Sequence, residues 1–144
     1  MTGPQPQSEA IDVLARTLYG EARGEPAEGR EAIACLVMNR VRKARGRKGG
    51  YWWGNTVAEV CRKPWQFSCW NADDPNREAL LKATARNKVF AVCLRIARDA
   101  IEGRLSDPTG GATHYHARGI TPPWARRRSP KIVIGDHLFY VDVE

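Results

Sequence analysis

Two glutamates in the stretch LYGEARGE, residues 18–25, are the side chains best suited to acid–base chemistry. Apolar residues recur at helical spacing in the residues before Glu21, which predicts a helix that ends near this glutamate. Glu25 follows four residues later. At the C-terminal end of a helix the dipole disfavours negative charge, and apolar neighbours partly desolvate a carboxyl group. Both effects favour a protonated Glu21 near neutral pH, which is the form that a general acid needs. The alternative from the pattern alone is a structural ion pair between Glu21 and Arg16 or Arg23.

The elements that must position these acids are mainly helices. One helix is predicted to begin at Ser8 and to end between Glu21 and Gly24, and a second to run from Pro26 to about Arg45. A third, short helix begins at the Thr56-x-x-Glu59 capping box. A fourth begins at Asp74 and Pro75 and ends at Gly103. The last of these is expected to be the longest, with Leu81 among its inward residues. Residues 105–130 are rich in Gly, Pro and aromatic residues and are expected to be irregular. The segment KIVIGDHLFYV, residues 131–141, predicts two short strands around a Gly-Asp turn.

The expected architecture is therefore mainly α (α+β), with a small C-terminal β-hairpin. A chain of 144 residues is long enough for one domain with a sizeable core. We expect a single domain over residues 8–144, preceded by a flexible tail at residues 1–7 that is rich in Pro and Gln.

The charge balance is basic, with 23 Lys and Arg against 16 Asp and Glu and a net charge of +7. Five cations fall in VRKARGRK, residues 41–48 (six if Arg40 is counted), and four in ARRRSPK, residues 125–131. Such patches are either solvated surface or contacts for a polyanion, such as nucleic acid or an anionic wall polymer. No apolar run approaches the roughly 18 residues of a membrane span, so stable membrane insertion is not expected. The N-terminus has neither a basic start nor an apolar core, so no secretory signal peptide is predicted.

The four cysteines do not form a metal or disulfide framework that the sequence alone identifies. Cys35 and Cys93 fall on apolar helix faces and are expected in the core. Cys61 and Cys69 flank a loop, so they could form a disulfide or remain thiols. No C-x-x-C spacing occurs, and neither a metal ion nor a cofactor is predicted.

Five sequence blocks resemble, in order, the catalytic domain of the spore-cortex-lytic and cell-wall hydrolase family. They are LYGEARGEPAEGREAIACLVMNRV (18–41), PWQFSCWN (64–71), GATHYHA (111–117), PPWA (122–125) and IGDHLFY (134–140). The resemblance implies a lysozyme-like fold, related to the lytic transglycosylases, that acts on the glycan strands of peptidoglycan. In that family the first glutamate of the Tyr-Gly-Glu-Ala motif is the catalytic acid, and Glu21 occupies this position here.

The resemblance also implies two groups of residues on either side of a sugar cleft. One group is Gln66, Phe67 and Ser68, and the other is Thr113, His114 and Tyr115. Aromatic side chains in loops can stack on pyranose rings, which adds Trp70, Trp124 and Tyr140 to the expected substrate-binding residues, beside Trp65. His116 completes the expected set, although it stands where we expected an aromatic residue or Asn.

Two chemical routes are open for such an acid. Two-carboxylate glycosidases place a base or nucleophile about 5–10 Å from the acid. A single carboxylate can instead protonate the leaving oxygen and then take the C6 hydroxyl proton, which gives a 1,6-anhydro-muramyl end. Glu25 is expected to stabilise the start of the next helix by its charge, and Asp107 is the best remaining candidate for a second carboxylate. We therefore favour the lytic-transglycosylase route, with a hydrolytic muramidase as the alternative.

Two further functions remain as alternatives. One is a metal-dependent amidase or peptidase that uses His114, His116 and His137 with Asp107 or Asp136, although no H-E-x-x-H motif occurs. The other is a non-catalytic nucleic-acid or wall-binding module, for which no nucleic-acid-binding motif is apparent. For the setting, we expect a phage or prophage endolysin made in the cytoplasm and released to the wall, with a stand-alone bacterial wall enzyme as the alternative.

Overall fold

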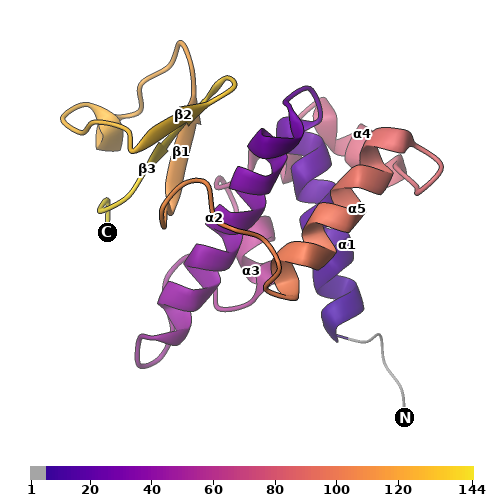
Figure 1. The fold of residues 1–144 in the computed structure, drawn as a ribbon, viewed down its shortest axis with the longest axis horizontal. Helices are drawn as coiled ribbons and strands as arrows, with labels where there is room; N and C mark the ends of the chain where they lie inside the picture. Colours follow the sequence, from indigo (N-terminus) through magenta and orange to yellow (C-terminus); the bar gives the residue numbers. More distant parts are fainter. Residues whose placement is uncertain (1–5) are drawn as a thin grey trace.

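In the computed structural model, which describes residues 6–144, helix α1 (Pro6–Ala22) runs through the middle of a group of helices (Figure 1). Its residues Val13, Leu14 and Leu18 are completely buried, because helices pack around α1 on several sides. The helix begins at Pro6, two residues before the predicted cap at Ser8, since proline is tolerated in a first helical turn. The rest of the predicted tail, residues 1–5, lies outside the described residues.

Helices α2 and α3 follow the predicted pattern. Helix α2 (Ala27–Arg45) starts directly after Pro26 and ends before a glycine, as expected. Helix α3 (Val57–Arg62) is capped by Thr56, whose hydroxyl oxygen accepts the Glu59 N–H at 3.2 Å. The sequence signals at helix ends therefore located both elements correctly.

The longest predicted helix is wrong, because residues 74–103 form two helices. Helix α4 (Asn76–Lys82) and helix α5 (Lys88–Ile101) are separated by an extended break. The Asn87 side chain accepts two N–H groups of the following turn, at 2.9 and 3.1 Å, and so caps a new helix. Arg16 of α1 donates to carbonyl groups at the end of α4, which fixes that end. As a result Leu81, predicted to point inward, is exposed.

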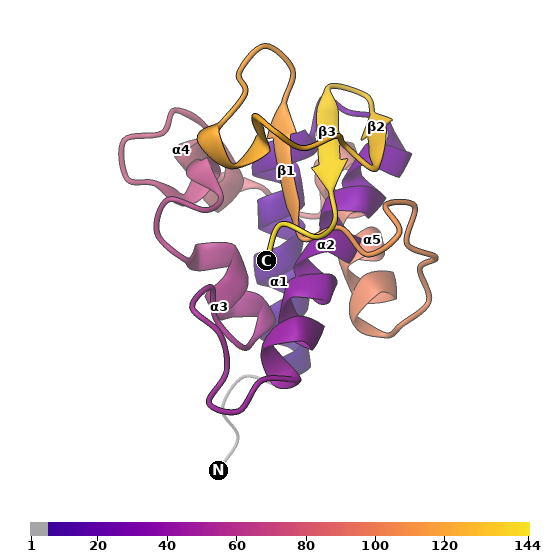
Figure 2. The same ribbon diagram turned by 90° about the vertical axis from the view of Figure 1, so that its left-hand side faces the viewer.

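The C-terminal part forms a three-stranded antiparallel sheet in the order β1-β3-β2, which lies beside α2 (Figures 1 and 2). Strands β2 (Ile132–Ile134) and β3 (His137–Tyr140) form the predicted hairpin. Strand β1 (His114–Ala117) was expected to be irregular, but it pairs with the other side of β3. Four residues among glycines and prolines give little local strand signal, so the long-range pairing decides this element.

The two faces of β1 have different surroundings. Tyr115 faces the helical body and packs against Phe67 and Phe139. His116 points to the other face and stacks on Tyr140, with a ring-centroid distance of 5.3 Å. The connection after β1 contains a short 3₁₀ helix, η2 (Pro123–Ala125), which brings an aromatic residue back against this second face.

The predicted mainly α class is confirmed, with the small sheet as its β part. All four cysteines are buried thiols, so the disulfide considered for Cys61 and Cys69 is not formed. Burial raises the pKa of Cys61 to about 12. Within residues 6–144, no helix combines the length and apolar character that a membrane crossing requires.

Candidate active site

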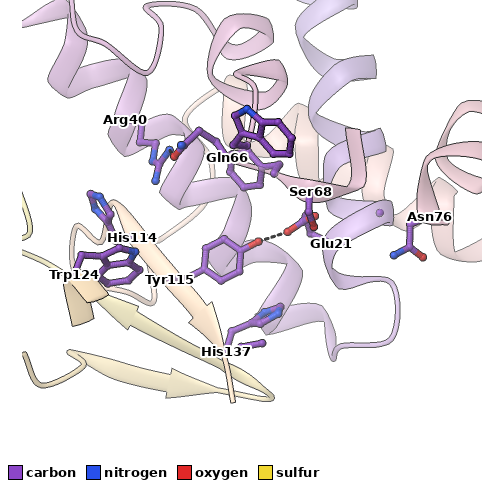
Figure 3. A pocket seen from close by; sticks show the side chains of 13 residues that line it. Glu21, Arg40, Gln66, Ser68, Asn76, His114, Tyr115, Trp124 and His137 are labelled. Atoms are coloured by element: carbon purple, nitrogen blue, oxygen red, sulfur yellow. Dashed lines mark hydrogen bonds between the residues drawn. The ribbon is translucent and has the colours of Figure 1, made fainter. Parts of the chain in front are cut away.

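Glu21 lies in the last turn of α1 and lines a pocket of about 470 Å³ between the helices and the sheet (Figure 3). Its Oε2 accepts the backbone N–H of Cys69 at 3.1 Å, and its Oε1 accepts the hydroxyl of Tyr115. Within residues 6–144 it forms no salt bridge. Arg16 pairs with Asp12 at 3.0 Å, so the structural ion-pair alternative is wrong for Arg16.

Arg23 is also directed away from Glu21. Its Nη2 donates to the Asn76 side chain at 2.8 Å, and its guanidinium lies over the Tyr19 ring. The structural ion pair is therefore excluded for both arginines, and the Glu21 carboxyl group is left at the pocket surface.

A close approach of two backbone segments brings the Cys69 N–H to Glu21. Cys69 belongs to the 3₁₀ helix η1 (Ser68–Trp70), which packs directly on α1. A Cβ atom at Gly20 would lie only 2.6 Å from the Cys69 Cβ and 2.9 Å from a Leu80 methyl group. The glycine before Glu21 is therefore required for this contact, which explains its place beside the acid.

Tyr115 supplies the second donor to Glu21 from the sheet side. The protein excludes water from its phenol group, and the Glu21 charge lies next to it; both raise the pKa of Tyr115 well above its usual range. The phenol therefore keeps its proton and acts as a hydrogen-bond donor. The acid is thus held by one donor from the helical side of the pocket and one from the sheet.

Most of the predicted substrate-binding residues line this pocket. Those that do are Gln66, Phe67, Ser68, His114, Tyr115 and Trp124. The pocket also includes Trp65, which was expected in the cleft, and residues that were not in the predicted set, namely Gly20, Arg40, Asn76, Ala117 and His137. Arg40 had a recognisable signal, because it is a charged residue on an otherwise apolar helix stripe. Asn76 had none, since only the packing of α4 brings it here. His137 was considered as a metal ligand, and it lines the pocket because of its place on β3.

Four predicted residues do not line the pocket, and they are Trp70, Thr113, His116 and Tyr140. The Trp70 indole donates to the Thr17 hydroxyl at 2.9 Å. His116 and Tyr140 lie within hydrogen-bond distance at 2.8 Å, and both rings contact Trp124. His116 and Tyr140 therefore contact a pocket-lining residue, Trp124, without lining the pocket themselves.

His114 forms part of the sheet wall as a neutral imidazole. Its Nδ1 lies 3.0 Å from the Thr113 hydroxyl, and its Nε2 lies 3.3 Å from a Glu144 carboxylate oxygen. Burial, together with the positive charge of Arg40, lowers the pKa of His114 to about 4. At neutral pH this side chain can therefore offer hydrogen bonds but carries no charge.

Glu25, predicted to stabilise the start of α2 by its charge, lies beside the first turn of that helix and also contacts the hairpin. Its Oε1 accepts the Asp136 N–H at 2.8 Å and lies 3.7 Å from His137 Nδ1, so it anchors the turn between β2 and β3. The turn backbone at Gly135 comes so close to this carboxylate that a Cβ there would lie 2.3 Å from it. This contact with the hairpin is a role of Glu25 that the sequence did not indicate.

Asp107, the best candidate for a second carboxylate, organises its own loop. It accepts hydrogen bonds from Thr109 and from the Asn39 amide at 2.9 Å. Burial alone would raise the pKa of Asp107, but these hydrogen bonds hold it below its usual range. Among residues 6–144, Glu21 is the one carboxylate that lines the pocket.

The three histidines of the proposed metal site do not converge. Side chains alternate along a strand, so His114 and His116 share one face of β1, while His137 is paired with Ala117 on the other face. In the part of the chain that the structure describes, no cluster of three or more His, Cys, Asp or Glu side chains could hold a metal ion. The geometry therefore gives no support to the metal-dependent alternative.

Comparisons with known proteins identify the family and the fold of this chain. The sequence profile of the Cell Wall Hydrolase family matches residues 24–140, a range that begins just after Glu21. The spore cortex-lytic enzymes of Bacillus subtilis (strain 168) and Bacillus cereus are 31% and 33% identical over 132 residues, which is 90% of this chain. The chain spans 36% and 43% of the length of these two relatives.

Two solved structures share the fold. The catalytic domain of the germination-specific lytic transglycosylase SleB from Bacillus anthracis has a TM-score of 0.69 and 29% identity, covering 96% of this chain and 98% of that one. The catalytic domain of the Bacillus cereus SleB protein has a TM-score of 0.70 and 29% identity, covering 96% and 93%. The arrangement of helices and sheet described above is thus that of a known catalytic domain.

Proposed function

Because the chain belongs to the cell wall hydrolase family, we propose that it is a lytic transglycosylase that cleaves peptidoglycan strands between N-acetylmuramic acid and N-acetylglucosamine. The observation that carries this proposal is the position of Glu21, the one pocket-lining carboxylate of residues 6–144, between two hydrogen-bond donors. The names of the related proteins, spore cortex-lytic enzyme and lytic transglycosylase, support the same substrate and reaction class.

In the proposed reaction Glu21 acts first as an acid and then as a base. Its carboxyl proton passes to the oxygen that bridges the two sugars, and the glycosidic bond breaks as positive charge develops on the muramyl ring. The resulting carboxylate then takes the proton of the C6 hydroxyl, whose oxygen closes on C1. One bond is broken and one is formed, no water is consumed, and Glu21 regains its proton.

The neighbours of Glu21 fit the two stages of this cycle. The Cys69 N–H and the Tyr115 hydroxyl both donate to the carboxylate, so they stabilise the charge that appears after the first proton transfer. A hydrolytic muramidase would need a base or nucleophile for water, and no other described carboxylate lines the pocket. The single-acid route is therefore the better supported of the two.

The experiment is digestion of purified sacculi by the native protein and by the Glu21→Gln variant. Glutamine keeps the shape of the side chain but cannot donate the acidic proton, so lysis should fall by at least about 100-fold. Glu28→Gln, an exposed carboxylate on α2, is the matched control and should lyse at the native rate. Native lysis by Glu21→Gln would contradict the assignment.

Mass spectrometry of the released fragments distinguishes the reaction classes. Elimination gives anhydro-muramyl ends that are one water lighter than the reducing ends produced by hydrolysis. An amidase or peptidase would instead release free peptides, and activity that disappears in excess chelator would point to a metal-dependent enzyme.

We also propose that the basic segments contact anionic wall polymers. Arg126 and Arg127 are exposed, form no salt bridge within residues 6–144, and flank a surface pocket that shares Trp124 with the cleft. Replacing both by glutamine should weaken binding to sacculi that carry anionic polymers and should make that binding less sensitive to salt. Equal binding by both proteins to sacculi with and without these polymers would contradict this role.

For the biological setting we propose an endolysin that needs a membrane lesion to reach the wall. The test is expression in a bacterial host with and without a co-expressed phage membrane-lesion protein. Lysis only with the lesion protein supports the proposal, and lysis without it would contradict the proposal.

A further inference from the structure

Arg40 is a buried cation in the cleft wall that has no counterion. It comes from α2, is 6% exposed, and lines the same pocket as Glu21. Within residues 6–144 no carboxylate forms a salt bridge with it, and Glu144, the carboxylate that most influences it, accepts hydrogen bonds from Tyr51 and Trp52 instead. Burial without an ionic partner is costly for a charged group, so this position requires an explanation.

The guanidinium is held in one orientation. Its Nε donates to the Thr113 carbonyl oxygen at 2.7 Å, and its Nη1 donates to the Gln66 side-chain oxygen at 3.3 Å. The Trp53 ring lies beneath it, with the guanidinium carbon 4.8 Å from the ring centroid. Burial lowers the pKa of Arg40 to about 10, which still leaves the group charged at neutral pH. A fixed and charged donor loses little entropy when it binds a ligand.

The remaining N–H groups of Arg40 are free to face the cleft. Its Nη2 forms no hydrogen bond with any described residue. The fully buried side-chain nitrogens that lack a partner are Arg23 Nη1 and His137 Nδ1, and Arg40 Nη2 is not among them, so it remains accessible. Figure 3 shows the end of the side chain beside Gln66, on the same side of Glu21 as Trp124. Nη2 is therefore placed to donate to a ligand in this half of the cleft.

The acceptors that Arg40 already uses indicate the chemistry of that ligand. Both the Thr113 and the Gln66 atoms are neutral carbonyl oxygens. The proposed substrate carries the same kind of acceptor on each ring, in its N-acetyl groups. Resting on the proposed function, we propose that Arg40 is a substrate-binding residue that donates to the acetyl carbonyl oxygen of the amino sugar held at the Trp124 end of the cleft.

The test compares kcat/KM for two proteins on two substrates. Native protein and Arg40→Lys are assayed on glycan strands that are N-acetylated or chemically de-N-acetylated. Lysine keeps the charge but loses the planar donor fork. We expect de-N-acetylation to lower kcat/KM of the native protein by about tenfold or more, mainly through KM, and that of Arg40→Lys by less than about threefold. The same factor for both proteins would overturn the inference.

The controls separate this inference from the proposed function. Arg95→Lys, an exposed arginine on α5 outside both basic segments, should show the same factor as the native protein. If the native protein releases no fragments from acetylated strands, the proposed function fails. If it does release them and the factors for native and Arg40→Lys are equal, only the assignment of Arg40 fails.

A measurement on unmodified Arg40 covers the case in which the variant does not fold. In the Glu21→Gln protein, the side-chain ¹⁵N resonances of Arg40 should shift on titration with a tetramer of N-acetylglucosamine. They should not shift with the de-N-acetylated tetramer, and the Arg95 resonances should not move with either. Shifts of Arg40 with both tetramers, or with neither, would overturn the inference.

Discussion

The two walls of the cleft are built in different ways. The helical wall, with Glu21 and Ser68, depends on the tight contact between α1 and η1, in which the Gly20 backbone packs against the Cys69 side chain. The sheet wall, with His114 and Tyr115, depends on strand pairing and on side chains stacked behind it. The acid takes one hydrogen bond from each wall. Damage to either wall should therefore reach Glu21, but through different physical causes.

The largest expected effect is a pH dependence of the unfolding free energy that comes from His114 in the sheet wall. The pKa of His114 falls from its ordinary value of 6.5 to about 4 on folding, so between these values the unfolded chain binds more protons than the folded one. The stability due to neutral His114 is complete above about pH 6.5 and is lost as the pH falls towards 4, by up to about 3 kcal/mol. Urea unfolding at pH 7 and pH 4.5 measures it, and His114→Gln should flatten the slope. An equally steep slope in the variant would contradict this account of the sheet wall.

The next largest effect concerns the helical wall. In Gly20→Ala the new methyl group would press against Cys69 and Leu80, which should cost about 1–3 kcal/mol of unfolding free energy. It should also reduce lysis, because the displaced Cys69 N–H supports Glu21. Gly24→Ala has no atom within 4 Å of the new Cβ and should change stability by less than about 1 kcal/mol. Equal effects of the two variants would show that the α1–η1 contact is not tight.

A smaller effect is expected at the point where the walls are tied together. Glu25→Ala removes the acceptor for the Asp136 N–H at the hairpin turn, which should cost about 1–2 kcal/mol. Glu28→Ala, at an exposed site, should cost less than about 0.5 kcal/mol. Chemical denaturation provides both values. Hydrogen exchange should show faster opening of β2 and β3 in the first variant, and exchange that is unchanged there would refute the anchoring role.

The smallest expected effect concerns the hydrogen bond between Tyr115 of the sheet wall and Glu21 of the helical wall. Tyr115→Phe removes only the hydroxyl that donates to Glu21, so lysis should fall by about tenfold while the fold is kept. Tyr19→Phe, whose hydroxyl accepts from Asn87 outside the cleft, should leave the rate unchanged. Steady-state lysis with a thermal melt of each variant distinguishes loss of the hydrogen bond from loss of structure. A native rate for Tyr115→Phe would mean that the sheet wall does not act on the acid.

The residues on the helical wall were largely predictable, and those on the sheet wall were less so. The position of Glu21 at a helix end followed from periodicity, and the Gln66–Ser68 block was expected in the cleft. Strand β1 was missed, and with it the reason why Tyr115 and His116 point to opposite sides. Glu25 was placed correctly at a break between helices, but its contact with the hairpin turn was not predicted, because that partner lies 111 residues away. Local pattern carries no information about such contacts.

By itself the sequence determined the mainly helical class, the caps and breaks of α2 and α3, the C-terminal hairpin and the position of the acid. These depend on side-chain periodicity and on cap and turn residues, which act over a few positions along the chain. Only the tertiary structure decided the division of α4 from α5, the third strand, the two donors to Glu21 and the burial of Arg40 in the cleft wall. Each of these depends on contacts between segments that are distant in sequence. Such contacts contribute to the free energy only when the chain is folded.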